Sequence, residues 1–192
     1  AKTLKDPLAA LSGTINAEMK QVSGLYQQTA FSQISLLADV NLSNKQLKVT
    51  LPTLNITQIN HGLFAGPIQM AAQYQGTITT PFKGILKIES LQSGLFNGQA
   101  WLEPQTIDLS KVFNIQLHLK DVEIEELLKQ HPTSDLTGKG LVDGTLPIEV
   151  DLNSEPPSFL IQQGQISSQP SGGLLKYQPA TKSGIGKSNQ SM

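Results

Sequence analysis

The chain of 192 residues contains no cysteine and no arginine, and only 15% of its residues are charged, well below the usual quarter. The lack of cysteine excludes disulfides, thiolate metal sites and cysteine nucleophiles. All 14 basic residues are lysines and the formal net charge is −1. Nucleic-acid-binding proteins usually carry a basic patch and use arginine to grip phosphate, so nucleic acid is not an expected partner.

The chain also lacks any apolar run of the roughly 18 residues that a membrane-spanning helix needs, so no membrane span is expected in it. Its first residues, AKTLKDPLAAL, lack the apolar segment of a signal peptide. We therefore expect an excised piece of a longer protein, which the resemblance described below implies is its C-terminal fragment. Residues 179–192 show no apolar pattern and are expected to form a flexible tail, which leaves 1–178 for one antiparallel β domain.

Alternation of apolar and polar residues is the dominant pattern of the chain. This period of two is typical of strands with one apolar and one polar face, and such strands normally pair antiparallel. Turn signals separate the runs, and we predict an all-β chain of about ten strands. The apolar positions of the clearest runs are Leu36, Ala38, Val40, Leu47, Val49, Leu51, Ile115, Leu117, Leu119, Leu146, Ile148 and Val150.

One segment, DVEIEELLKQHP, departs from this alternation. Ile124 and Leu128 recur at helical spacing, and the acidic residues near the start suit the positive end of a helix dipole. Asp121 or a neighbour can cap the helix and Pro132 can end it. The segment predicts a short amphipathic helix near 122–131.

A short motif is repeated. HGLFAG at 61–66 recurs as SGLFNG at 93–98, with a weaker copy, SGLY, at 23–26. Each copy lies between alternating runs. We interpret the copies as hairpins in which glycine supplies positive φ angles and the Leu-Phe pair packs at the edge.

The stretch LTGKGLVDGTLPIEV carries glycines at 138, 140 and 144. It is not a P-loop, which requires G-x-x-x-x-G-K-[ST] followed by a helix, because an alternating run follows here. We interpret the glycines as sites where a strand bends or another element approaches closely. Pro147 then indicates a strand edge or a position where no N–H is needed.

No catalytic or metal-binding constellation is present in the sequence. The three histidines are far apart and share no ligand spacing; His118 is expected on the polar face of a strand. Trp101 is expected in or beside the core. We therefore expect no catalytic residue, no metal, no cofactor and no enzyme activity.

Residues 112–178 resemble the C-terminal region of the YdbH-like envelope proteins, members of the wider AsmA-like group that includes TamB. The resemblance rests on several elements in the same order. An alternating strand leads into a short helix ending in LLK. LTGKGLVDGTLPI, GQI and PSGGLLKY follow, beginning at residues 136, 164 and 170.

The resemblance implies a periplasmic segment of a bridge-like protein whose parent is anchored in the inner membrane. Such proteins are long, curled antiparallel sheets whose concave face forms an open apolar groove, described as β-taco-like. They conduct phospholipid between the inner and outer membranes, so acyl chains are expected along the apolar positions given above. A small outer-membrane lipoprotein is expected to add strands to the C-terminal sheet edge, at Gly172, Gly173, Leu174, Leu175 and Tyr177.

Three interpretations remain open from the residues. The first is a lipid-binding β-groove that takes part in phospholipid transport. The second is a β-rich scaffold that recruits a lipoprotein by strand addition. The third is a periplasmic domain that binds a small solute such as a dicarboxylate, which would need a lysine-lined pocket. Alternation also fits a closed β-sandwich, since an open trough and a closed core use the same pattern.

Overall fold

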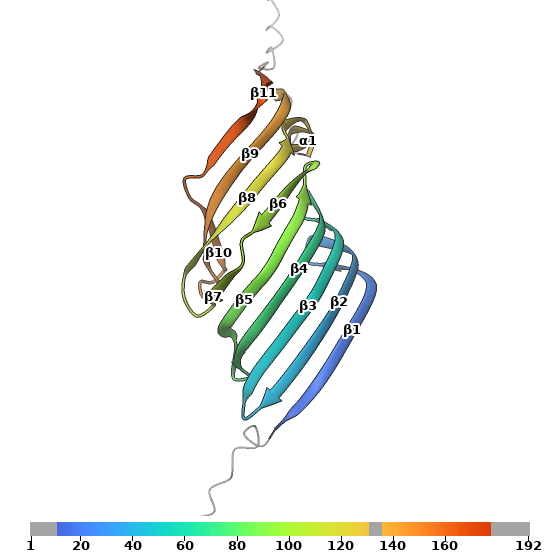
Figure 1. The fold of residues 1–192 in the computed structure, drawn as a ribbon, viewed down its shortest axis with the longest axis vertical. Coiled ribbons are helices and arrows are strands. Elements are labelled where there is room, and N and C mark those ends of the chain that lie inside the picture. The colour runs from blue at the N-terminus through green and yellow to red at the C-terminus, as the bar shows by residue number, and fades with distance from the viewer. Residues whose placement is uncertain (1–10, 131–135, 178–192) are drawn as a thin grey trace, which may run out of the picture.

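The computed structural model describes residues 11–130 and 136–177, which form eleven strands and one short helix (Figure 1). This confirms the all-β prediction. The predicted helix near 122–131 forms at 124–130, whereas Pro132 and the predicted tail at 179–192 lie outside the described residues. The elements are β1 Gly13–Tyr26, β2 Thr29–Ser43, β3 Gln46–Asn60, β4 Phe64–Thr77, β5 Thr80–Leu95, β6 Gly98–Leu102, β7 Gln105–Asp108, β8 Phe113–Glu123, α1 Ile124–Gln130, β9 Leu136–Asp151, β10 Ser158–Ile161 and β11 Gln165–Tyr177.

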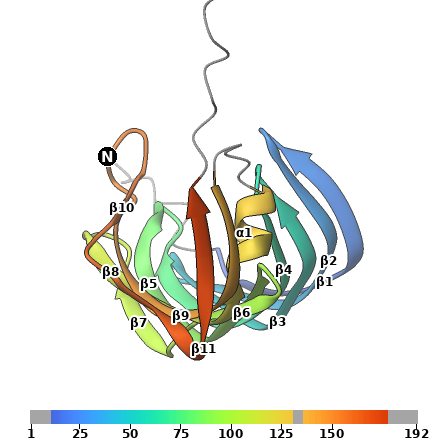
Figure 2. The same ribbon diagram turned by 90° about the horizontal axis from the view of Figure 1, so that it is seen from above.

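All of these strands belong to one antiparallel sheet, with the order β1-β2-β3-β4-β5-β6-β8-β9-β10. Two places depart from this simple path. β5 pairs with β6 near its end and with β7 near its start, and β9 pairs with both β10 and β11 along its far side. The sheet does not close into a barrel. Seen along its long axis, it is curled and open on one side, with α1 inside the curl (Figure 2).

Bulges contribute to the curl of the sheet. Gln21 in β1 and Gln33 in β2 have φ angles of 51° and 52°, and the register of the β1–β2 ladder shifts beside them. Their amides donate to side-chain hydroxyls of the facing strand: Gln21 N to Ser35 Oγ at 3.0 Å and Gln33 N to Ser23 Oγ at 2.9 Å. Because a bulge increases local twist and bends its strand, these satisfied bulges help the long strands to curve.

A third bulge lies at Asp121, which has a φ of 55°. Its amide donates to Asp143 Oδ1 at 2.8 Å, and Gln169 Nε2 donates to the same oxygen at 3.2 Å. These hydrogen bonds, led by the Asp121 amide, lower the pKa of Asp143. Asp121 therefore lies within β8 and does not cap α1, which begins at Ile124. Its bulge instead ties β8, β9 and β11 together.

Burial is concentrated in the middle and later strands. Nearly all of the buried hydrophobic residues lie between β5 and β9, the exception being Ala72 in β4. One cluster contains Ile88, Leu102 and Ile107, against which Phe113 and Leu117 of β8 pack. The pairing explains this cluster, because β7 stays with β5 while β8 pairs with β9. The sheet forks there, and its two branches cover each other's apolar side chains.

The repeated motifs form hairpin ends, as predicted, but with different turns. In the first copy, Gly62 has a φ of 79°, in agreement with the prediction. In the second copy the positive φ angles belong to Phe96 and Asn97, and beside the third copy the positive φ belongs to Gln27, the residue that follows it. Gly94 instead lies in β5, where an added Cβ would meet the Gly66 carbonyl oxygen. The expectation that glycine supplies these angles was therefore right for one copy only.

Candidate functional site

A continuous row of apolar residues crosses the sheet. Residues paired directly across an antiparallel ladder lie on the same face, so a chain of register partners identifies one face from strand to strand. From β1 to β9, without β7, the register joins apolar partners at every step. This apolar row consists of Met19, Leu36, Leu54, Met70, Leu91, Leu102, Leu117 and Leu146.

The residues predicted from alternation all lie on the face of this apolar row. Leu36, Leu117 and Leu146 are members of it, and the others alternate with polar residues in the same strands. Val40 pairs with Val49, and Ile115 pairs with Ile148. Sequence reasoning missed the members in β1, β3, β4, β5 and β6, although Leu54, Met70 and Leu91 also follow locally alternating patterns interrupted by bulges.

The face of the apolar row is the concave one. α1 lies inside the curl (Figure 2) and packs on this face, since a Cβ added at Gly138 would lie 2.8 Å from Ile124 Cγ2 and 3.2 Å from Leu128 Cδ1. Gly138 is an even-numbered position of β9, like Leu146. The burial of Leu102 also fits an inner face, where side chains of a curled sheet converge.

The opposite face is polar. Directly paired residues on this face form a second row from β2 to β11. They are Ser35, Asn55, Gln69, Gln92, Trp101, His118, Thr145 and Gln165. His118 lies there as predicted. Trp101, expected in or beside the core, lies on this outer face instead, stacked on His118 with ring centroids 5.1 Å apart. Its indole N–H donates to Glu103 Oε1 at 3.0 Å, so this donor has a hydrogen-bond partner on the outer face.

Accessibility of the concave face changes along the sheet. Every side chain of β1 is exposed and no residue of β2 or β3 is buried. Of the predicted lining residues, only Leu119 and Val150 are buried, at 8% and 3% exposure; the others are half-buried. A closed β-sandwich would bury most of them, so the concave face over β1–β3 is open.

One end of the concave face is occupied by α1. Ile124 and Leu128 pack over Gly138, where an ordinary side chain would clash. At the other end of the helix, Gln130 Oε1 accepts a hydrogen bond from the Phe64 amide at 2.7 Å, so the helix reaches from β9 to the β3–β4 turn. The glycine of β9 thus provides space for a neighbouring element, as predicted.

The other glycines of β9 also mark close approaches. Gly140 has a φ of 128°, and a Cβ there would lie 2.9 Å from the Gly173 Cα of β11. Pro147 falls between the stretches of β9 that pair with β10 and β11. Its carbonyl accepts from the Gln162 amide at 2.9 Å, so its nitrogen faces this break in the ladder, where no N–H is needed.

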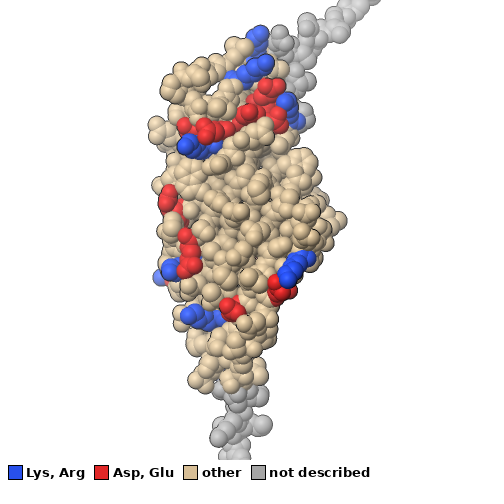
Figure 3. All heavy atoms as spheres, turned by 45° about the vertical axis from the view of Figure 1, so that its right-hand side comes forward, with Lys and Arg blue, Asp and Glu red and all other residues tan. Residues whose placement is uncertain are grey.

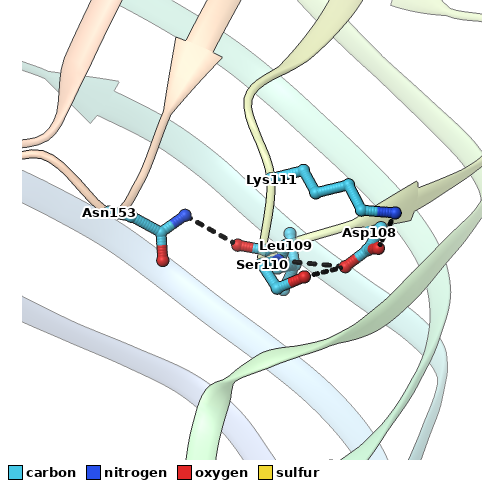
Figure 4. A network of polar contacts seen from close by, with 5 residues as sticks. All are labelled: Asp108, Leu109, Ser110, Lys111 and Asn153. Atoms are coloured by element: carbon cyan, nitrogen blue, oxygen red, sulfur yellow. Dashed lines mark hydrogen bonds and ion pairs between the residues drawn. The ribbon is translucent and has the colours of Figure 1, made fainter.

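A polar network fixes two loops at the end of the sheet away from α1 (Figure 4). Asp108 accepts hydrogen bonds from Ser110 Oγ at 2.6 Å and Ser110 N at 3.1 Å, and pairs with Lys111 Nζ at 2.9 Å. These contacts, the Ser110 hydroxyl first, lower the Asp108 pKa to about 2. Asn153 Nδ2 donates to the Leu109 carbonyl at 3.3 Å. The β7–β8 loop is thereby tied to the β9–β10 loop.

The residues predicted for strand addition all lie in β11. Gly172 adopts a φ of 74°, while Leu174, Leu175 and Tyr177 are 52%, 63% and 69% exposed. Within the described residues, β11 pairs with β9 alone and β1 with β2 alone. Both strands therefore present a row of backbone groups that the described sheet does not use.

Charged groups are sparse on this molecule. The only charged residues of β2 and β3, Asp39 and Lys48, alternate with the apolar positions and so lie on the outer face. A broad area without lysine, aspartate or glutamate is visible in Figure 3, with charged side chains in small groups around it. Among residues 11–130 and 136–177, no cluster of His, Asp or Glu could hold a metal ion, and no helix is long and apolar enough to cross a membrane.

Comparison with protein families gives one match. The model of the YdbH-like family, described as intermembrane phospholipid transport protein YdbH, matches residues 6–192. This match extends the resemblance seen at 112–178 to nearly the whole chain. No curated protein and no solved structure matches the chain.

Proposed function

The chain belongs to the YdbH-like family of intermembrane phospholipid transport proteins, and from this we propose that its concave face carries phospholipid acyl chains. The function of the family is intermembrane, so the chain works in the cell envelope. We further propose a periplasmic position, a parent protein anchored in the inner membrane, and a role without enzyme activity.

The observation that carries this proposal is the unbroken apolar row from β1 to β9. Transfer of an acyl chain of about 16 methylenes into water costs on the order of 13 kcal/mol of free energy, at roughly 0.8 kcal/mol per methylene. A surface that stays apolar at every strand removes most of that barrier along its whole width. One polar residue in the row would interrupt this path, and the register places none there.

The openness of the early strands suits a moving ligand. Aliphatic side chains such as Leu36, Val40 and Val49 are half-buried and offer dispersion contacts without fixed hydrogen-bond geometry. Such contacts are individually about 0.1–0.2 kcal/mol, so a lipid can exchange one set for the next as it slides. A tight pocket with specific polar groups would instead hold the lipid in place.

A matched pair of variants tests the acyl path. Val40 faces the concave side and the adjacent Asn41 faces outward, and neither is buried. We expect Val40→Glu and Asn41→Glu to fold equally well, because both carboxylates reach water. Only Val40→Glu should lose co-purified phospholipid in native mass spectrometry, since a carboxylate opposes an acyl chain that would desolvate it. Retention of lipid by Val40→Glu, or equal loss from both variants, would contradict the proposal.

A second candidate function is strand addition at β11, favoured by the single pairing of this edge strand. We propose that a small outer-membrane lipoprotein adds a strand along Gly172–Tyr177, where main-chain hydrogen bonds supply affinity and exposed Leu175 and Tyr177 supply side-chain contacts. Amide hydrogen exchange of residues 172–177 should slow at saturating lipoprotein. Unchanged exchange in β11 under those conditions would rule out this edge as the docking site.

A further inference from the structure

The lysines of the described chain are distributed unevenly among its surface hollows. The hollows of the described residues include four of about 420 to 450 Å³. Three of them are lined without any charged residue. The fourth, of about 420 Å³, lies between α1 and the ends of β9 and β11, and its lining includes Lys129, Lys139 and Lys176. We refer to it as the lysine hollow.

Two of these lysines carry free positive charge. Lys129 is 2.7 Å from Glu126 and 3.5 Å from Glu125, so its charge is largely compensated. Lys139 and Lys176 form no ion pair with any described residue. Glu125 also lines the hollow, so the lining carries three lysines against one glutamate, a formal excess of two positive charges in a chain whose formal net charge is −1.

The remaining lining is mainly apolar and adjoins the concave face. Leu128 of α1, Leu136 of β9 and Leu174 of β11 contribute to the wall. Leu136 and Gly138 belong to the positions of β9 that share the face of the apolar row.

Lys139 pairs with Leu174 and Lys176 with Thr137, so these side chains start from the opposite face of the sheet. The β8–β9 pairing ends at Leu141, and beside α1 the hollow is lined by residues of both faces of β9. A ligand at this edge of β9 therefore contacts the lysines at the end of the acyl path.

We propose that the lysine hollow binds the anionic headgroup of a glycerophospholipid whose acyl chains lie on the concave face. This inference rests on the proposed function and adds the lipid class. Lysine ammonium groups bind phosphate as point charges, and basic pockets beside apolar surface bind anionic lipid headgroups. A free dicarboxylate would also match the lysines, but it would leave the leucine wall without a partner.

Binding of two soluble short-chain lipids to the intact chain tests this assignment. Calorimetric titration with dihexanoyl phosphatidylglycerol, which is anionic, and dihexanoyl phosphatidylcholine, which is zwitterionic, measures the headgroup preference directly. We expect about fivefold tighter binding of the anionic lipid at low salt, because exposed charge pairs contribute modestly. The preference should shrink at high ionic strength.

The variant pair separates the hollow from general charge. Lys139→Gln/Lys176→Gln should abolish the anionic preference, because phosphatidylglycerol loses more binding than phosphatidylcholine, whose choline already offsets the charge of its phosphate. Lys48→Gln/Lys83→Gln removes the same charge from lysines that form no ion pair with a described residue and lie outside the described hollows. This control should keep the preference.

Other results overturn the inference in distinguishable ways. An unchanged preference in Lys139→Gln/Lys176→Gln, or an equal loss in the control, would place headgroup recognition elsewhere. Binding of inorganic phosphate or succinate as tight as that of the anionic lipid would make the hollow a free-anion site. Binding of both lipids without preference would contradict this inference and leave the acyl path intact, whereas binding of neither lipid would contradict the proposed function as well.

Discussion

The two halves of this sheet share one sequence pattern and differ in burial. The open half, β1–β3, contains no buried residue, although its strands alternate as regularly as any in the chain. The packed half, β5–β9, holds the buried clusters around Leu102 and Leu119. Alternation therefore specifies which residues share a face, and the path of the sheet specifies whether that face is covered.

The fork between β7 and β8 explains the difference. β7 pairs with β5 and β8 pairs with β9. The two branches bring Ile107 and Phe113 into one cluster. No such fork exists among β1, β2 and β3, which pair over nearly their full length. We conclude that the packed half holds the fold together and that the open half offers accessible apolar surface.

The largest expected difference between the halves comes from shortening members of the apolar row. Leu102→Ala leaves a cavity beside Ile88 and Ile107 and should lower the free energy of unfolding by about 2–4 kcal/mol. Met19→Ala, at a side chain 37% exposed, should lower it by less than about 1 kcal/mol. Urea denaturation of both variants provides the comparison. Equal destabilisation would show that the halves contribute alike.

Glycine substitutions sharpen the same contrast at smaller magnitude. A Cβ at Gly138 would lie 2.8 Å from Ile124 Cγ2, whereas one at Gly24 would meet no atom within 4 Å. Gly138→Ala should cost about 1–2 kcal/mol by overpacking and should speed amide exchange in α1 by displacing the helix. Gly24→Ala should leave exchange in its hairpin unchanged. If α1 keeps its protection in Gly138→Ala, the helix does not depend on this contact.

The smallest expected effect is acid loosening of the β7–β8 loop. The pKa of Asp108 is lowered from 3.8 to about 2, first by the Ser110 hydroxyl. A lowered carboxylate pKa contributes stability that is present above about 3.8 and lost as the pH falls towards 2. Titration of the Asp108 carboxyl by NMR should give a midpoint near 2, with the Ser110 amide signal shifting over the same range. Asp108→Asn should abolish that shift; a midpoint near 3.8 would contradict the network.

The class of fold and the shared apolar face could be predicted because period-two alternation determines side-chain direction in any strand. Leu36 and Ile148 share a face with the residues two positions away in their own strands, whatever the path of the sheet. The close approach of other elements at Gly138 and Gly140 could also be predicted, since glycine within an alternating run leaves space for another element.

Other features depend on contacts that the sequence pattern does not carry. Trp101, the only tryptophan, is expected in or beside the core, but the register places it outward, where His118 stacks on its ring. Phe96 and Asn97 adopt the positive φ angles expected of glycine, because the two-residue turn between β5 and β6 requires them. The lysine hollow joins α1, β9 and β11, so no local motif indicates it.

Photo-crosslinking at two adjacent leucines tests most directly whether the concave face is the lipid path. Leu36 belongs to the apolar row, while Leu37, 46% exposed, faces outward from the same strand. With a benzophenone amino acid at either position and phospholipid supplied in vesicles, we expect lipid adducts at position 36 and essentially none at position 37. Adducts of equal yield at both positions, or only at position 37, would contradict it.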